Sequence, residues 1–419
     1  MRLNKFSVIV FLALLVVVLV SVNFILYSKL QFKDRFNEEK RFIKLKLQEL
    51  LLRKVEFKNL PTDSSGQYKI EADFLQANIH LEEDKHDVTL VTHCTSNHLH
   101  YLLDLTTHWK GPLSLAVFVP GYDVKTTYTS LFGLYKCVDR FRDHATVHLV
   151  YPLSHPPVEN SLGPIIQQAL DHLGSCDEFI AKINNHDLAG KNSWNYANVK
   201  VPYPNNLLRN VGRSVVPREH YVFVVDVDMM CNGNLYQSFL GLARQLNLFG
   251  KRNDKRVFVV PTFESKQKVS PLLTKQELLD LWDSGSVQPF YYQACWKCQQ
   301  NLDFGAWKSY HSSNNNLQIA YTVTWKDPWE PFYIAPNYVP VYDERFKQYG
   351  FNRISQVCET HIAGFNFMVL NNAFLIHHGF KVKESFHSAK DEENARNRDI
   401  FRTFKKELKI KYPRSTRHC

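Results

Sequence analysis

The segment from Tyr221 to Met230 constrains the fold of this chain more than any other part of the sequence. It reads Y-V-F-V-V-D-V-D-M-M, an almost wholly apolar run that leads into two carboxylates, Asp226 and Asp228. A continuous Val and Phe run predicts a strand covered on both faces, as in a parallel sheet flanked by helices. Two acids at the end of such a strand need a compensating cation, because an unpaired buried carboxylate is costly.

The spacing of the two aspartates indicates a metal site. Oxygen ligands one residue apart suit a hard divalent ion, Mn²⁺ or Mg²⁺, that also holds substrate phosphates. The pattern is typical of the Asp-x-Asp site of nucleotide-sugar glycosyltransferases. Short strings of this kind are also common as solvated acids in turns. Their position directly after a buried strand favours metal binding by Asp226 and Asp228.

Residues 6–27 contain no charged side chain and consist mainly of Val, Leu, Ile and Phe. About 20 such residues span a bilayer as a helix. A cleaved signal peptide is the alternative, since Arg2 and Lys5 would serve as its basic start. The run is longer than the roughly 7–15 residues usual for that class and lacks a small-x-small cleavage site, which favours an anchor. With residues 1–5 as a cytoplasmic tail, the sequence predicts a single-pass type II protein with a luminal catalytic domain.

Residues 28–85 are predicted to form a stem between the anchor and the folded part. Leu and Phe recur at helical spacing over 42–51, which indicates a short tether helix that packs on the catalytic domain or on a second copy. Residues 61–66 (P-T-D-S-S-G) are typical of a linker. The remaining stretch, about 335 residues, is enough for one large α/β domain or two fused ones.

Charge and cysteine content narrow the class of protein. The formal net charge is +10, but no Lys/Arg block interleaved with aromatic residues indicates nucleic-acid binding. The excess suits an anionic small substrate or an anionic glycan. Eight cysteines in an oxidising lumen predict disulfides, whose pairing the sequence leaves open. Cys295-x-x-Cys298 has no second C-x-x-C, which disfavours a zinc ribbon, and no N-x-S/T sequon occurs.

Strand and helix patterns alternate in the first half of the folded part. The predicted strands cover 87–92, 113–119, 146–151 and 256–261, with helices after the first of them and over 235–248. Such alternation implies crossovers and a mostly parallel sheet, with ligands at the carboxyl ends of the strands. We therefore interpret residues 86–262 as a nucleotide-sugar-binding α/β half.

Residues 263–419 have a different character, rich in Trp, Tyr, Pro and Asn with weak periodicity. The stretch 321–343 carries many aromatic residues between prolines. Any one of these rings is best explained as core, but together they resemble the walls of a sugar subsite. Residues 394–412 are predicted to form a packing helix with a charged, solvated face. We interpret this half as the acceptor-binding part of the same catalytic domain.

A polar helix face precedes the aspartate strand. At positions i, i+3, i+4 and i+7 of this predicted helix stand Asn206, Arg209, Asn210 and Arg213. Beside the metal acids such a face would grip a sugar nucleotide, with Arg209 or Arg213 pairing a phosphate or carboxylate. A solvated helix face is the alternative, and the pattern does not decide between the two.

Two further roles have candidates but no local signal that settles them. His377 would complete a divalent site, since two carboxylates and phosphate oxygens leave room for an imidazole nitrogen. A single histidine is more often structural. Inverting transfer requires a carboxylate that accepts the proton of the acceptor hydroxyl. The candidates are Glu330, Asp343, Glu344 and Glu359.

Longer stretches of the sequence resemble one family of enzymes. They are 88–95, 111–120, 221–229, 289–292, 327–333, 343–356, 375–381 and the terminal K-Y-P-R-S-T-R-H-C. Over these stretches the chain is similar to the Golgi β-1,4-glucuronyltransferases that prime matriglycan on α-dystroglycan. That family includes the second catalytic domain of the bifunctional xylosyl/glucuronyltransferases. The resemblance covers essentially the whole predicted luminal domain.

The resemblance implies a GT-A-type fold, Mn²⁺ dependence and inverting transfer of glucuronate from UDP-glucuronate to O4 of a β-xylose on an O-mannosyl glycan. It implies metal binding by Asp226, Asp228 and His377, and it favours Glu359 as the base. Cys231-Asn-Gly departs from the proline-containing stretch expected after the aspartates, which leaves the donor sugar open.

Two alternative functions follow from the same residues. One is a related Golgi transferase that uses UDP-xylose or a UDP-N-acetylhexosamine, and the other is a membrane-anchored lectin or chaperone without catalytic activity. The intact D-V-D disfavours the second. The expected partners are a UDP-sugar, a glycan on a secreted or membrane glycoprotein, and a second copy or other Golgi glycosyltransferases. No nucleic-acid partner is expected, and the predicted location is the Golgi membrane.

Overall fold

The structure is a computed structural model that describes most of the chain. The described residues are 5–52, 56–79, 87–157, 163–171, 173–185, 201–249, 253–270, 274–311, 316–382 and 387–419. The chain divides into two compact units, Met1–Val55 and Glu56–Cys419.

The first unit is one long helix, α1 (Lys5–Leu52), of 48 residues. Its window Leu14–Gln31 has a mean hydropathy of 1.9, and none of it is buried. By length and composition this helix fits a single-pass membrane anchor, as predicted for 6–27. The same helix continues through residues 42–51, where the sequence predicted a separate short helix.

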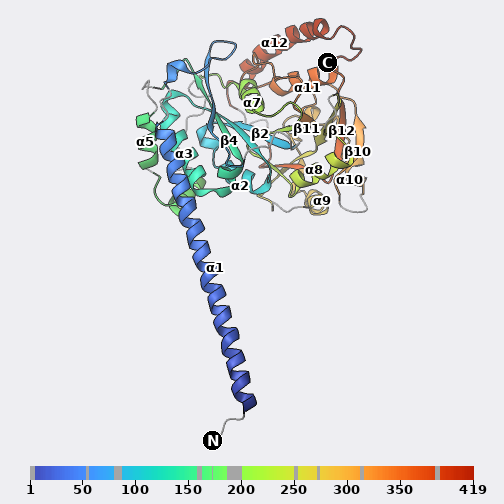
Figure 1. The fold of residues 1–419 in the computed structure, drawn as a ribbon. Coiled ribbons are helices and arrows are strands. Elements are labelled where there is room, and N and C mark those ends of the chain that lie inside the picture. Colours follow the sequence, from blue (N-terminus) through green and yellow to red (C-terminus); the bar gives the residue numbers. More distant parts are fainter. Residues whose placement is uncertain are drawn as a thin grey trace. The chain divides into compact units, whose positions relative to one another are not determined.

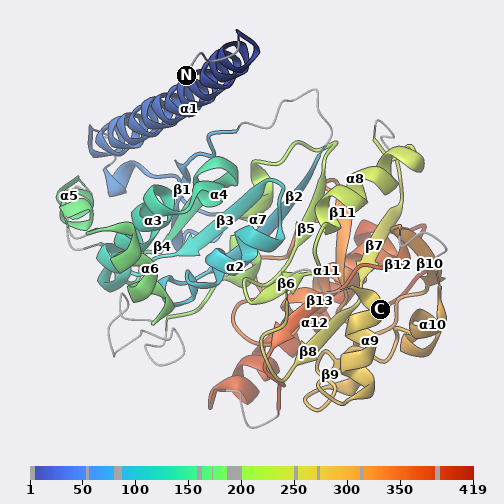
Figure 2. The ribbon, with the colours of Figure 1, turned by 90° about the horizontal axis from the view of Figure 1, so that it is seen from below.

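A nine-stranded sheet forms the centre of the second unit (Figures 1 and 2), in the order β1-β4-β3-β2-β5-β11-β7-β12-β10. Its strands are β1 (Tyr68–Leu75), β2 (Val88–Cys94), β3 (Leu113–Phe118), β4 (Ala145–Pro152), β5 (Tyr221–Val224), β7 (Arg256–Val260), β10 (Gln318–Val323), β11 (Phe332–Pro336) and β12 (Asn366–Asn371). Their Val, Leu and Phe side chains are almost all buried, as helices on both faces require.

The α/β class is confirmed, but the prediction of a mostly parallel sheet holds only for part of it. β4, β3, β2 and β5 run parallel. β11 then enters antiparallel between β5 and β7, and the edge strands β1 and β10 are also antiparallel. Because β11 comes from the second half of the chain and bonds to two strands of the first, the two predicted halves share one sheet.

A second sheet has four short strands in the order β6-β13-β8-β9. They are β6 (Met229–Cys231), β8 (Thr262–Ser265), β9 (Val287–Pro289) and β13 (Leu375–His378). β13 pairs antiparallel with β6 and parallel with β8. Since β6 follows β5 directly, the chain passes from the large sheet to the small one through the two aspartates.

Helices surround the large sheet, and the last helix precedes the C-terminus (Figure 2). They are α2 (Tyr101–His108), α3 (Val124–Cys137), α4 (Asp139–His144), α5 (Gly163–Asp171), α6 (Cys176–Asn184), α7 (Asn205–Ser214), α8 (Leu235–Gln245), α9 (Lys275–Asp283), α10 (Phe304–Ser309), α11 (Asn352–Ile362) and α12 (Lys390–Lys411). α7 packs on β2 and β3, and α12 packs beside α11 (Figure 1).

The predicted stem, 28–85, does not form one segment. β1 lies within it and pairs with β4, and the turn before β1 is held by the Asp63 carboxylate, which accepts the backbone N–H groups of Gln67 and Tyr68. Residues 56–79 therefore belong to the globular unit. Nothing in the strand pattern of 87–151 indicated this, because an antiparallel edge strand contributes only a short, half-buried run.

The cysteines and the aromatic stretch are mostly structural. Disulfides join Cys137 to Cys176, Cys295 to Cys298 and Cys358 to Cys419, while Cys94 and Cys231 are buried as free thiols.

In the aromatic stretch 321–343, Trp325 and Trp329 are buried in the hydrophobic core of the second half. These rings are core, as the sequence favoured for each ring taken singly.

Gly212 allows α7 to approach the sheet, and this contact generates a testable prediction. A Cβ at Gly212 would lie 2.6 Å from Cγ1 of Val91, whereas one at Gly241 in α8 would meet nothing within 4 Å. Gly212→Ala should destabilise the protein by about 1–3 kcal/mol through overpacking. Gly241→Ala should be neutral or stabilise it by about 0.5–1 kcal/mol through helix propensity. Thermal unfolding of both variants tests this, and equal unfolding temperatures would contradict the close packing.

Candidate active site

The aspartate pair lies in the turn between the two sheets. β5 ends at Val224, and the Met229 backbone N–H donates to the Asp226 carbonyl oxygen at 3.0 Å, which closes the turn. In the antiparallel pairing of β6 with β13, Met229 faces His377. This register brings Nε2 of His377 to 3.2 Å from Oδ2 of Asp228. Two of the three predicted metal ligands, far apart in sequence, are thus neighbours.

The orientation of His377 is set by its other nitrogen. Nδ1 lies 2.8 Å from the Gly379 carbonyl oxygen, which only accepts, so Nδ1 carries the hydrogen. In a neutral ring the lone pair of Nε2 then faces an oxygen of Asp228. Two lone pairs at this distance repel unless a proton or a cation lies between them. A backbone-oriented imidazole beside a carboxylate is the arrangement that metal-binding histidines use.

Asp226 is held differently, by two guanidinium groups. Its Oδ1 lies 3.3 Å from Arg209 and its Oδ2 lies 2.5 Å from Arg353. Burial acts to raise the pKa of Asp226, but the charges of Arg353 and Arg209 outweigh it and hold that pKa well below its usual range. The guanidinium of Arg353 also stacks on the Phe332 ring at 3.8 Å. Asp226 is therefore a fixed carboxylate whose position is defined by α7 and α11.

Asp228 has weaker and more accessible partners. Besides His377, the ammonium of Lys381 lies 3.9 Å from Oδ2. Burial raises the pKa of Asp228, but the hydrogen bond and charge of His377, with Lys381, lower it overall. The described residues contain no group of three or more His, Cys, Asp or Glu side chains arranged to hold a metal ion. A metal at Asp228 and His377 would therefore take further ligands from substrate or water.

The polar face of α7 is covered by another segment rather than solvated, although Asn210 is only half-buried. Asn206 donates to the carbonyl oxygens of Asp343 and Asn352, and Asn210 bonds to the backbone of Tyr342 and to Glu344. Its four polar residues thus hold the segment 337–353 against the sheet. Neither of the two interpretations of this face, donor grip or solvated surface, anticipated that arrangement.

The two arginines of this face have different surroundings. Arg213 donates to Asn337, Val339 and Pro340 and is 4% exposed. Its hydrogen-bonding capacity is taken up by the turn that follows β11. Arg209 is the one member of the face that contacts an aspartate of the D-V-D motif, and its other nitrogen donates to Asn206 and Asn352.

Of the candidate bases, Glu359, which the family resemblance favoured, lies away from the aspartates, whereas Glu330 lies near them. Glu359 is buried against the C-terminal segment, where Lys411 at 2.7 Å and Tyr412 at 2.9 Å donate to Oε1. It stands six residues after Arg353 on α11, about 240° around the helix, and so faces away from Asp226. The structure thus places Glu359 among C-terminal partners, and its role as the base stays a prediction that these contacts do not favour.

Glu330 lies near the arginine–aspartate pair. It stands two residues before Phe332, on whose ring Arg353 stacks. The charges of Arg353 and Asp226 act on its carboxylate. Burial raises the pKa of Glu330 above its usual value, although Arg353 opposes this. Among the described residues no hydrogen bond or ion pair engages its carboxylate. Of the four acids proposed as base, Glu330 therefore has the surroundings of a reactive group.

Three other side chains of the site had not been singled out. They are His93 at the end of β2, Arg353, and Tyr291 after β9, which lies within electrostatic reach of Glu330, Arg353 and Asp226. The Tyr203 hydroxyl lies 2.7 Å from Nδ1 of His93, whose buried Nε2 has no hydrogen-bond partner among the described residues. Burial and Arg209 lower the pKa of His93 to about 3, so its ring is neutral. Its position at the carboxyl end of a parallel strand was the signal that could have identified it.

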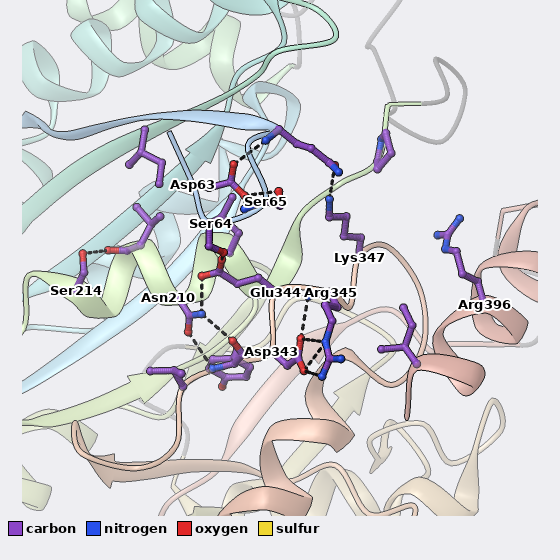
Figure 3. Close-up of a pocket in the computed structure, with 18 residues that line it drawn as sticks. Asp63, Ser64, Ser65, Asn210, Ser214, Asp343, Glu344, Arg345, Lys347 and Arg396 are labelled. Carbon is purple, nitrogen blue, oxygen red and sulfur yellow. Dashed lines mark hydrogen bonds and ion pairs between the residues drawn. The ribbon is translucent and has the colours of Figure 1, made fainter. Parts of the chain in front are cut away.

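A cavity of about 890 Å³ lies on the other side of the segment that follows β11 (Figure 3). Figure 3 shows Asn210 pointing toward Glu344, and Arg345 beside Asp343, with Asp63 and Lys347 across from them. None of Asp226, Asp228 and His377 lines it. The volume alone therefore does not make it the reaction site, because the aspartates and the histidine predicted to hold a metal lie elsewhere.

Comparison with known proteins places this geometry in a family. Residues 87–413 match the model of the family described as glycosyl-transferase for dystroglycan. The chain belongs to this glycosyltransferase family. The match covers most of the second unit and includes the D-V-D turn, Glu330 and His377. The family resemblance predicted from the sequence is thereby confirmed, and the protein is an enzyme of the glycosyltransferase class.

Relatives agree over most of the chain. β-1,4-Glucuronyltransferase 1 of Danio rerio is 40% identical over 366 residues, which cover 85% of this chain and 83% of that protein. The Homo sapiens protein of the same name is 39% identical over 359 residues, 85% of this chain and 82% of that protein. Xylosyl- and glucuronyltransferase LARGE2 of Rattus norvegicus is 29% identical over 295 residues, 70% of this chain and 34% of that protein.

Proposed function

We propose that this glycosyltransferase is a Mn²⁺-dependent β-1,4-glucuronyltransferase with a GT-A-type fold. It would transfer glucuronate, with inversion, from UDP-glucuronate to O4 of a β-xylose on an O-mannosyl glycan. The observation that carries the proposal is the pairing of Asp228 with a backbone-oriented His377 beside the doubly clamped Asp226. The names of the relatives support the donor, and the apolar α1 supports an anchor in the Golgi membrane with the catalytic domain in the lumen.

The chemistry of the metal pair fits a divalent ion. A carboxylate oxygen and an imidazole nitrogen suit Mn²⁺, and Mg²⁺ as an alternative favours the oxygen more strongly. Asp228 and His377 would hold the ion, with the D-V-D turn placing Asp226 beside them. When bound, such an ion supplies Lewis-acid stabilisation of the negative charge that develops on the diphosphate. The two arginines keep Asp226 ionised and fixed, so the turn is organised before substrate arrives.

The surroundings of the pair offer groups for the donor. Nε2 of His93 is buried and has no partner within the described part of the chain, and a buried unpaired nitrogen is costly unless a ligand satisfies it. Lys381 is 31% exposed at 3.9 Å from Asp228, which leaves its ammonium free to approach an anionic donor. Arg209 would act through Asp226. Asn206, Asn210 and Arg213 would position the segment 337–353 instead of touching the donor.

Glu330 replaces Glu359 as the proposed base. Its carboxylate would accept the proton of the acceptor O4 hydroxyl as that oxygen bonds to the anomeric carbon. The bond from that carbon to the diphosphate oxygen breaks in the same step, and UDP leaves with the electron pair. An unengaged carboxylate whose pKa is raised by burial accepts a proton more readily than Glu359, which is already bonded to Lys411 and Tyr412.

A panel of donors tests the proposal directly. The purified full chain, with Mn²⁺ and a β-xyloside acceptor, should transfer sugar from UDP-glucuronate and not from UDP-xylose, UDP-N-acetylglucosamine or UDP-N-acetylgalactosamine. Transfer is read as labelled disaccharide, and its linkage by methylation analysis. Preference for an uncharged donor sugar would overturn the donor assignment, and absence of transfer from all four would overturn the proposed reaction.

Substitution of adjacent histidines tests the metal site. His377→Ala should raise the Kd of Mn²⁺-dependent UDP binding by at least about tenfold. Mutating a residue that only orients a metal ligand already costs that much, and loss of a ligand should cost no less. His378→Ala is the matched control, because His378 follows it in β13 but is exposed and lines a small cavity with Asp104 and His108. Calorimetric titration of UDP with and without Mn²⁺ gives both values without requiring turnover. Equal losses in the two variants, or no loss in either, would contradict the assignment.

Glutamine substitutions test the base. Glu330→Gln should lower kcat about 10²–10⁴-fold with UDP binding unchanged. Because burial raises the pKa of Glu330, wild-type activity should rise with pH through a value above that of an ordinary glutamate, and the variant should lack this limb. Glu344→Gln is the control, since Glu344 accepts hydrogen bonds from Asn210 and Ser64 away from the site. A retained acidic limb in Glu330→Gln would exclude the role.

A further inference from the structure

A second cavity, of about 710 Å³, lies between α12 and the C-terminal tail. We propose that this C-terminal basic cavity binds an acidic oligosaccharide, a short run of uronate-bearing sugars. The identity of the anion rests on the proposed function, in which the enzyme adds glucuronate, but the cavity itself does not. Its charged lining is Arg402, Lys405, Lys406, Lys409, Arg417 and His418.

The cavity is a built feature of the fold. Its lysines and Arg402 share one face of α12, at spacings of three and four residues. The opposite wall is the tail, which the Cys358–Cys419 disulfide fastens to α11. The Ser415 hydroxyl donates to the Ile362 carbonyl, and Arg417 donates to the carbonyls of His361 and Phe365. The tail is therefore held in place without any of the three lysines.

The described residues of the protein neutralise the positive charge of this cavity only in part. No Asp or Glu is among the described residues that line it. Within the described part of the chain, Lys405, Lys406 and Lys409 form no ion pair, and Arg402 has only an exposed pair with Asp399. Glu359, the nearest buried acid on α11, is already paired with Lys411. Like charges three and four residues apart on a helix repel each other. A bound polyanion would reduce this repulsion among the cations of α12.

The lining favours a sugar chain over other polyanions. Four apolar or aromatic residues alternate with the cations: Ile362, Leu408, Tyr412 and Pro413. Leu408 and Ile362 are buried beneath this surface, so Tyr412 and Pro413 would pack against the CH faces of sugar rings while lysines reach carboxylates. The volume lies in the range of pockets for small ligands, roughly 300–1,000 Å³, whereas a membrane or a nucleic-acid duplex needs a broad convex or extended surface.

The loop that carries the proposed base lies within electrostatic reach of the lysine face of α12. Asp327 lies within electrostatic reach of Lys405, and Glu330 within reach of Asp327. The loop from Asp327 to Glu330 thus runs between the proposed base and the lysine face of α12. An acceptor chain whose terminal xylose meets Glu330 would have its inner, acidic sugars directed toward that face. The cavity would then prefer long acidic acceptors over short neutral ones.

Direct binding tests this proposal. The full chain in detergent is titrated with a hexasaccharide of alternating glucuronate and N-acetylglucosamine, with neutral chitohexaose, and with tripolyphosphate as a compact anion. The wild type should bind the acidic hexasaccharide in preference to both. The combined variant Lys405→Glu, Lys406→Glu and Lys409→Glu should weaken that binding at least about tenfold, and the matching Lys→Gln variant should weaken it by less.

The matched control is Lys58→Glu, Lys182→Glu and Lys297→Glu, which changes the net charge equally at exposed lysines outside the cavity. It should bind like the wild type, apart from a small loss that added salt removes. Equal binding by the two triple variants, equal binding of chitohexaose, or preferred binding of tripolyphosphate would each overturn the proposal.

Transfer to a small β-xyloside separates this proposal from the proposed function. That acceptor carries no carboxylate for the lysines of α12 to bind, so the α12 triple variant should retain wild-type turnover with it. If the wild type transfers no glucuronate yet binds the hexasaccharide through the lysines, the reaction is wrong and the cavity stands. If transfer proceeds and the lysines do not affect binding, the cavity is wrong and the reaction stands.

Discussion

The carboxylate of Asp226 between the guanidinium groups of Arg209 and Arg353 is the interaction on which the site depends. It joins the D-V-D turn to α7 and α11, two helices separated by more than a hundred residues of sequence. A buried or half-buried ion pair stabilises little by itself, because desolvation offsets the attraction. Its effect is on position, since a carboxylate with two fixed cationic partners has one favourable orientation.

The passage of the chain from one sheet to the other explains why this turn serves a site. β5 belongs to the large sheet and β6 to the small one, so the four residues between them cross the junction. On the small sheet, the pairing of β6 with β13 sets His377 against Asp228 by register alone. A shift of one residue would turn His377 to the other face, because strand side chains alternate.

Local pattern predicted the elements better than it predicted their roles. The polar face of α7 was visible at helical spacing, yet polarity could not tell whether solvent, substrate or another segment covers it. The segment 337–353 does, through Asn206, Asn210 and Arg213. Likewise four acids were candidates for the base, and only the direction in which each side chain points separates Glu330 from Glu359. That direction depends on packing between segments remote in sequence.

The sequence by itself determined the apolar α1 helix, the strand before the D-V-D motif, the α/β class and the family, because periodicity and motif are properties of short contiguous stretches. The tertiary structure decided the antiparallel entry of β11, the place of β1 in the sheet, the contact of Asp228 with His377, and the surroundings of Glu330 and of the lysines on α12. Each of these joins residues that no local interaction brings together. These contacts are fixed by strand register and by which faces of the helices and strands must be buried. Neither can be determined from a local stretch of sequence.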